Sequence, residues 1–303
     1  YTIMPNLSQS FKMGTSFSPA GQLLTDEQTG IVGRLGKSPA LVPVTIAVKS
    51  TDGSVNHTYR YQMINHHMLS VPLMLVALRE SALAQRSLPP KFTARISGDI
   101  NFSQGVTLKV NNIGTTNSLS ISDFLMASSM LLDNKYQNLK LENLNLKMEV
   151  EPVDHSAQIK SIDLARSVVT PGTELVARVV LELYKDKTTE LTVKIKVPED
   201  TPDGQYSLMI GSAEEALYHE QLTHPKHFDP QNIDTLAAAL QRLLSYPTNQ
   251  LYARLTLNNT GAAADGVEMP NLPESRKAMY FGTHQNDTAL VYNTVAVDIP
   301  VDY

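Results

Sequence analysis

The densest group of side chains that could do chemistry lies in the last third of the sequence. Three histidines, His219, His224 and His227, fall within a stretch of nine residues. Four carboxylates accompany them, at Glu214, Glu215, Glu220 and Asp229. Imidazole nitrogens and carboxylate oxygens are ligands of zinc and other transition metals, so a metal site can be drawn from this group.

The spacing of these histidines is not that of a metal-binding helix. The string H-E-x-x-H is absent, and Pro225 interrupts any helix between His224 and His227. We therefore predict no metal and no cofactor. We interpret His219, His224 and His227 as polar residues between two helices, with a metal site as the weaker alternative.

No arrangement typical of nucleophilic or nucleotide chemistry accompanies the histidines. A serine nucleophile on a sharp turn needs G-x-S-x-G, which does not occur. The glycines Gly30, Gly33 and Gly36 match neither of the phosphate-binding strings G-x-G-x-x-G and G-x-x-x-x-G-K-[ST]. They predict a glycine-punctuated hairpin instead. The chain has no Cys, which excludes thiolate nucleophiles and disulfides. We expect no catalytic and no cofactor-binding residue here.

Charge and hydropathy exclude two classes of partner. Lys and Arg number 25 against 30 Asp and Glu, and the formal net charge of −5 is not suited to nucleic acid or to an anionic membrane surface. The longest apolar run, residues 68–78, is well short of the roughly 20 residues that span a bilayer. We expect no nucleic-acid partner and no transmembrane segment.

The elements that must position any site begin with a mixed domain at residues 1–135. Alternating apolar residues predict two hairpins, 42–48 with 55–63 and 92–102 with 106–110. Helical spacing predicts a helix over 70–86 and a second one that ends near Asn134. A short capping box at Ser120 and Asp123 marks the start of the second helix.

Long alternating strands without helix signals predict a β-sandwich over residues 136–211, with an immunoglobulin-like arrangement. Leu139 and Leu141 occupy odd-numbered positions, whereas the apolar residues from Leu144 to Val150 occupy even-numbered positions. One extra residue near Glu142 and Asn143 would restore a single buried face, so we predict a β-bulge there.

Residues 212–303 predict a helical insertion and returning strands that pack on the sandwich. Ser212 and Glu215 form a capping box, and Asp229 with Pro230 predicts the start of a second helix. A helix after Pro273 and a final strand over 291–301 follow. Taken together, the chain is predicted to be α+β and mainly β.

Several segments resemble bacterial proteins that carry a SpoIVB-type serine peptidase domain. Residues 7–14, 24–36 and 41–44 carry the most specific part of this resemblance, and the string P-D-G-Q-Y-S-L at 202–208 extends it. The resemblance implies a serine in an M-S-G-S-P turn and a histidine in a G-H string, both upstream of the matched region. Neither string occurs in this chain, so the resemblance implies its C-terminal, non-catalytic region.

The resemblance implies an exported bacterial protein, located in the periplasm, on the cell surface or outside the cell. The leading hypothesis is a non-catalytic interaction or assembly module that associates with itself or with a protein partner through β-edges such as 291–301. One alternative is the accessory half of a serine peptidase whose catalytic His and Ser lie upstream. Another is a glycan- or peptide-binding sandwich. The start at Tyr1 predicts a processed product or a piece of a longer chain.

Overall fold

The structure of this chain is a computed structural model that describes residues 21–27, 29–36, 40–83, 91–115, 121–264, 267–283 and 288–301. The predicted cap at Ser120, the predicted helix residues 84–86 and the resemblance at 7–14 lie outside these ranges. Five helices and several sheets make the described chain α+β and mainly β, which confirms the predicted class.

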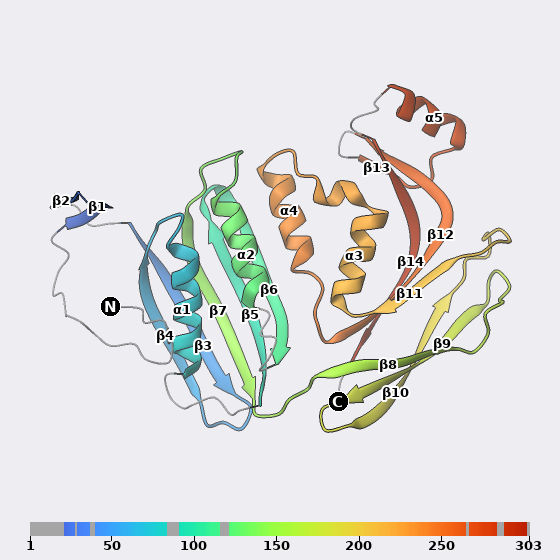
Figure 1. The fold of residues 1–303 in the computed structure, drawn as a ribbon, viewed down its shortest axis with the longest axis horizontal. Coiled ribbons are helices and arrows are strands. Elements are labelled where there is room, and N and C mark those ends of the chain that lie inside the picture. The colour runs from blue at the N-terminus through green and yellow to red at the C-terminus, as the bar shows by residue number, and fades with distance from the viewer. Residues whose placement is uncertain are drawn as a thin grey trace.

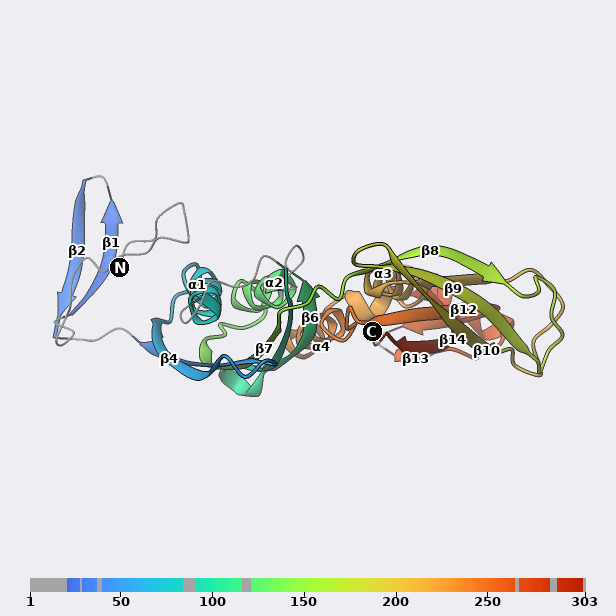
Figure 2. The ribbon, with the colours of Figure 1, turned by 90° about the horizontal axis from the view of Figure 1, so that it is seen from below.

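The first described element is a hairpin that stands apart from the rest of the chain in both ribbon views (Figures 1 and 2). It consists of β1 (Gly21–Glu27) and β2 (Gly30–Leu35), which pair antiparallel. The glycine-punctuated hairpin predicted for this segment is confirmed. All of β2 is exposed, so this hairpin does not belong to either hydrophobic core.

A five-stranded sheet with helices on one face forms the N-terminal domain (Figure 2). Its strands, in spatial order, are β4 (Asn56–Ile64), β3 (Leu41–Ser50), β7 (Leu141–Glu151), β5 (Thr93–Phe102) and β6 (Thr107–Thr115). Both predicted hairpins are present, β3 with β4 and β5 with β6, the second through the short turn η1 (Ser103–Gly105). The helices α1 (Ser70–Leu83) and α2 (Ile121–Leu132) cover the apolar face.

Strand β7 corrects the predicted domain boundary at residue 136. We expected this segment to open the sandwich, but it lies between β3 and β5 in the first sheet, parallel to β3. Its alternating leucines show that one face is buried and do not show in which sheet. The predicted bulge is confirmed, because Asn143 pairs with Asn101 and Leu141 pairs with Phe102, which leaves Glu142 as the extra residue.

A β-sandwich forms the second domain, and it draws on more of the chain than residues 136–211. One sheet is a meander of β8 (Ala157–Leu164), β9 (Glu174–Leu183) and β10 (Lys187–Lys196). In the other, β12 (Gln250–Ala264) lies between β11 (Ser207–Gly211) and β14 (Ala289–Pro300), and β13 (Val267–Met269) pairs with the end of β12. Consecutive strands are neighbours in the first sheet, and in the second sheet β13 and β14 both pair with β12 and not with each other, whereas an immunoglobulin domain has Greek-key connections.

The helices of the second half lie between strands of the sandwich. Between β11 and β12 come α3 (Ala213–Thr223), the short 3₁₀ turn η2 (Pro225–Phe228) and α4 (Ile233–Leu243); α5 (Glu274–Thr283) precedes β14. The predicted capping box of Ser212 and Glu215 is present. The predicted start at Asp229 is wrong, because Asn232 and Thr235 cap α4 reciprocally.

Helix α4 does not pack on the sandwich, which corrects the expectation for residues 212–303. Its apolar stripe, from Ile233 to Leu244, joins the core of the N-terminal domain beside α2 and β6. The side-chain amide of Gln241 also binds Lys109 on the edge strand β6, accepting from its N–H at 2.7 Å and donating to its C=O at 3.1 Å. Helix α4 thereby covers a sheet edge and joins the two domains.

None of the helices in the described ranges is both long enough and apolar enough to cross a membrane.

Candidate functional site

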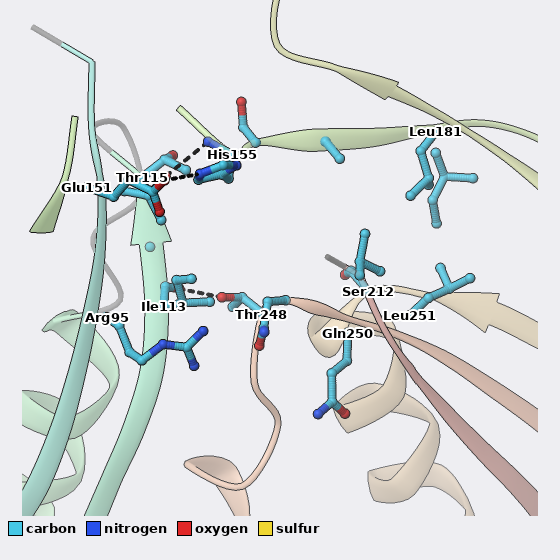
Figure 3. Close-up of a pocket in the computed structure, with 17 residues that line it drawn as sticks. Arg95, Ile113, Thr115, Glu151, His155, Leu181, Ser212, Thr248, Gln250 and Leu251 are labelled. Atoms are coloured by element: carbon cyan, nitrogen blue, oxygen red, sulfur yellow. Dashed lines mark hydrogen bonds and ion pairs between the residues drawn. The ribbon is translucent and has the colours of Figure 1, made fainter. Parts of the chain in front are cut away.

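A cleft of about 460 Å³ opens where the two domains meet (Figure 3). One wall consists of the ends of β5, β6 and β7, and the other consists of β8, β9 and the start of β12. Clefts of a few hundred Å³ at domain junctions are preferred positions for ligand sites. The lining includes five large apolar residues, Ile113, Ile159, Leu181, Leu251 and Val301.

Arg95 supplies a cation to the first wall of the cleft. It lies on β5 with its side chain exposed, on the sheet face opposite the helices, between Ile113 of β6 and Glu149 of β7 in the register. Figure 3 shows its guanidinium extending from the strand into the space between the walls. Within the described part of the chain, the side chain of Arg95 forms no hydrogen bond or ion pair.

The histidine of the cleft is held by the linker between β7 and β8. Thr93 is buried, and its hydroxyl donates to the C=O of Val153 at 2.8 Å and accepts the N–H of His155 at 3.0 Å. His155 Nε2 lies 3.2 Å from Glu151 Oε1. The histidine is thus positioned by β5, and the carboxylate beside it limits the positive charge at this end of the cleft.

A second hollow, of about 420 Å³, lies on the other side of this linker and shares His155 with the cleft. Lys91 and Lys185 place their amines 5.4 and 5.6 Å from the centre of the Tyr184 ring, and Lys91 Nζ lies 3.6 Å from buried Asp154. Burial alone would raise the pKa of Asp154. Hydrogen bonds from Ser156 and the charge of Lys91 outweigh burial and hold that pKa below its usual range.

The three histidines singled out in the sequence do not converge on one point. His224 and His227 stack with ring centres 5.1 Å apart, whereas His219 Nε2 contacts the hydroxyl of Thr256 at 2.7 Å. His227 lies between two carboxylates, with Nδ1 3.0 Å from Glu220 Oε1 and Nε2 2.9 Å from Glu268 Oε1. Among the residues that the structure describes, no group of three or more potential ligands is placed to hold a metal ion.

The carboxylates near these histidines have separate roles. Glu215 caps α3, and Asp229 pairs with Lys226 at 2.7 Å. Of the four carboxylates named from the sequence, Glu220 is the one that contacts a histidine, His227. It also accepts hydrogen bonds from Arg242 Nη1 at 2.6 Å and from the Tyr246 hydroxyl. Burial would raise the pKa of Glu220, but the bonds from Tyr246, His227 and Arg242 together lower it. The group is therefore an ion-pair network that ties α3, η2 and α4 together.

Burial keeps the neighbouring side chains uncharged. Desolvation lowers the pKa of His224, although Glu268 opposes it, and desolvation together with Arg254 lowers the pKa of His219. Desolvation and the bond to Glu220 raise the pKa of Tyr246. The neutral ring of His224 stacks on His227, which contacts two carboxylates. Such an arrangement is typical of a structural network.

The sequence reasoning missed Glu268 and the whole of the cleft. Glu268 reaches the histidines because β13 folds back on the end of β12, and no local pattern announces that pairing. Arg95 is one outward-facing position of an alternating strand and has the same sequence signature as Asp99 on that strand. Neither residue carries a signal that could have identified it.

Comparison of this chain with protein families, with curated proteins and with solved structures found no match.

Proposed function

We propose that this chain is a non-catalytic interaction and assembly module that associates with a second copy through strand β8. The observation that carries this proposal is the exposure of β8 at the edge of its sheet. Ile159, Ile162 and Leu164 are 38%, 42% and 44% exposed, and β8 pairs only with β9 among the described strands. Large apolar side chains beside an unpaired backbone edge favour addition of another strand.

The sandwich is open on the side of β8. The two sheets contact each other where β10 faces β12 and β14, and the core contains residues of β9, β10 and β12. From β8, only Ala157 packs partly against that core. A strand added at β8 would therefore cover apolar surface as well as form backbone hydrogen bonds.

The charges on β8 do not protect its edge. Lys160 lies 3.4 Å from Glu182, and Asp163 lies 3.4 Å from Arg178, so both are engaged by the neighbouring strand β9. Natural edge strands are usually blocked by free lysines, prolines or bulges. A bulge does interrupt the register between Ile159 and Ser161, but residues 161–164 beyond it pair regularly with β9.

Strand β14 contains most of the edge predicted from sequence, residues 291–301, and its surroundings are less favourable. It lies at the edge of its sheet, but Val295, Val297 and Ile299 pack against the sandwich core. Its charged residue Asp298 pairs with Arg254. We therefore assign the assembly edge to β8 and keep β14 as the secondary edge.

The setting in which this module works is also a proposal. The resemblance at residues 24–36 and 202–208 supports a place in the bacterial periplasm, on the cell surface or outside the cell, and the absence of Cys is compatible with it. A role beside an upstream serine peptidase domain stays a prediction.

Light scattering during size-exclusion chromatography over a concentration series tests the assembly proposal. We expect the chain to move from monomer to dimer mass as its concentration rises. The variant Ile162→Lys should stay monomeric at every concentration, because it places an unpaired charge on the edge. The matched control is Val168→Lys, which replaces an 84% exposed valine after β8 and should behave like the parent. A parent chain that stays monomeric throughout, or equal behaviour of both variants, would refute the proposal.

A further inference from the structure

We propose that the cleft between the domains binds a ligand that carries a carboxylate beside an apolar group, with Arg95 as the carboxylate receptor. This inference does not depend on assembly through β8. It is based on three observations at the cleft: an unpaired guanidinium, a set of apolar lining residues and an unpaired amide.

The guanidinium is the first observation. Arg95 lines the cleft, and its side chain forms no hydrogen bond or ion pair within the described ranges, although Glu149 is its neighbour in the register. A guanidinium has five N–H donors in a planar fork that matches two carboxylate oxygens. An arginine that points into a cleft with its donors unused is suited to bind an anion from outside.

The apolar lining is the second observation, and it limits which anion fits. Leu181 and Leu251 are each 3% exposed and belong to the sandwich core, so the cleft ends at the open end of that core. Ile113 and Ile159 add apolar side chains to the same lining. A fully hydrated anion such as free phosphate gains nothing from these apolar side chains, whereas an apolar group gains about 25 cal/mol for each Å² it buries.

The polar rim is the third observation. Gln250 is half-buried at the start of β12, and its side-chain amide has no partner among the described residues. Thr248 is already engaged, since its hydroxyl contacts Asn112 and the C=O of Ile113. Gln250 can therefore bond a peptide or carboxylate group that Arg95 holds, while Thr248 fixes the loop that carries it.

The opposite end of the cleft disfavours a second negative charge. Glu151 lies there, and His155 is placed against it at 3.2 Å. A ligand with one carboxylate fits this distribution better than a polyanion. Two sources share this chemistry, the C-terminus of a peptide that ends in an apolar residue and a free fatty acid.

Nuclear magnetic resonance titration of the whole chain tests the proposal and separates the two sources. The probes are the acetylated tripeptide Ala-Ala-Leu with a free carboxylate, the same peptide as its C-terminal amide, and decanoate. We expect the acid peptide or decanoate to shift the amides of Thr115 and Gln250 saturably. The amide peptide should bind about tenfold more weakly or worse, because it lacks the charge-assisted bonds to Arg95.

Two variants and one control complete the test. Arg95→Gln should weaken the acid probe by about tenfold or more and leave the amide peptide unchanged, whereas Ile113→Ala should weaken both equally. Arg60→Gln, an exposed arginine on the far edge strand β4, should change nothing. Binding to decanoate alone would identify a fatty acid, and binding to the acid peptide alone a peptide terminus; either supports the proposal. Absence of saturable shifts with both acids, or parental affinity in Arg95→Gln, would overturn it.

Discussion

His227 Nε2 lies 2.9 Å from Glu268 Oε1, and this contact joins the short turn after α3 to strand β13. The other ring nitrogen of His227 faces Glu220 at 3.0 Å. The side chains of His227, Glu220 and Glu268 are all largely buried, which distinguishes this network from an exposed surface pair.

Replacing Glu268 with Gln should lower the stability of the chain. The variant removes a largely buried negative charge that lies 3.9 Å from His224 Nε2 and 2.9 Å from His227 Nε2, so we expect a loss of about 1–3 kcal/mol in the free energy of unfolding. Urea unfolding followed by circular dichroism measures it. The control is Glu190→Gln, which alters an exposed pair with Arg178 at 3.7 Å and should change stability by less than about 0.5 kcal/mol. Equal effects of the two changes would show that the network does not stabilise the fold.

Acidification should destabilise the chain in two stages. The pKa of His224 is lowered from 6.5 by burial, so the folded state holds this ring neutral and loses stability as the pH falls below 6.5. The pKa of Glu220 is lowered from 4.5, mainly by its bond to Tyr246 against burial, so its contribution is present above 4.5 and is lost as the pH falls further. Urea midpoints measured across both values should fall throughout.

Variants separate these two stages. His224→Asn should flatten the upper part of the pH profile, and Glu220→Gln should flatten the lower part and lower stability at neutral pH. A parental profile that stays level from neutral pH down to 4.5 would contradict the role given to His224.

Gly98 should tolerate no side chain. Its φ is 140°, and an added Cβ would lie 2.1 Å from the C=O oxygen of Asn145 on the paired strand β7. Gly98→Ala therefore combines backbone strain with a clash against a fixed atom, and we expect a loss of roughly 2–4 kcal/mol or failure to fold. Gly282→Ala in α5 has open space around it and should be neutral or slightly stabilising. Thermal unfolding of both variants compares them directly.

Gln241 should protect the edge of β6 from exchange with solvent. Its side chain binds both backbone groups of Lys109, so Gln241→Ala should accelerate hydrogen exchange at the Lys109 amide and cost about 1 kcal/mol. Mass spectrometry or NMR of deuterium exchange resolves this position. Gln62→Ala on the exposed edge strand β4 is the control and should leave exchange at Lys109 unchanged. Unchanged exchange in Gln241→Ala would show that α4 is not what covers this edge.

The sequence by itself determined the individual elements of this protein. Alternation located the hairpins of the first sheet, and the parity change at Glu142 located a bulge that the register confirms. The capping box of Ser212 and Glu215 was also readable, because a cap depends on residues three positions apart. These features depend only on residues that are close together in the sequence.

Only the tertiary structure decided which elements pack together. Periodicity reports that a face is buried and not what buries it, so β7 was placed in the wrong sheet and α4 against the wrong domain. The cleft depends on the same long-range choices, because Arg95 and Gln250 belong to different domains and meet only where those domains are joined. Pairing between distant strands is selected by the whole core, and no short window of residues contains it.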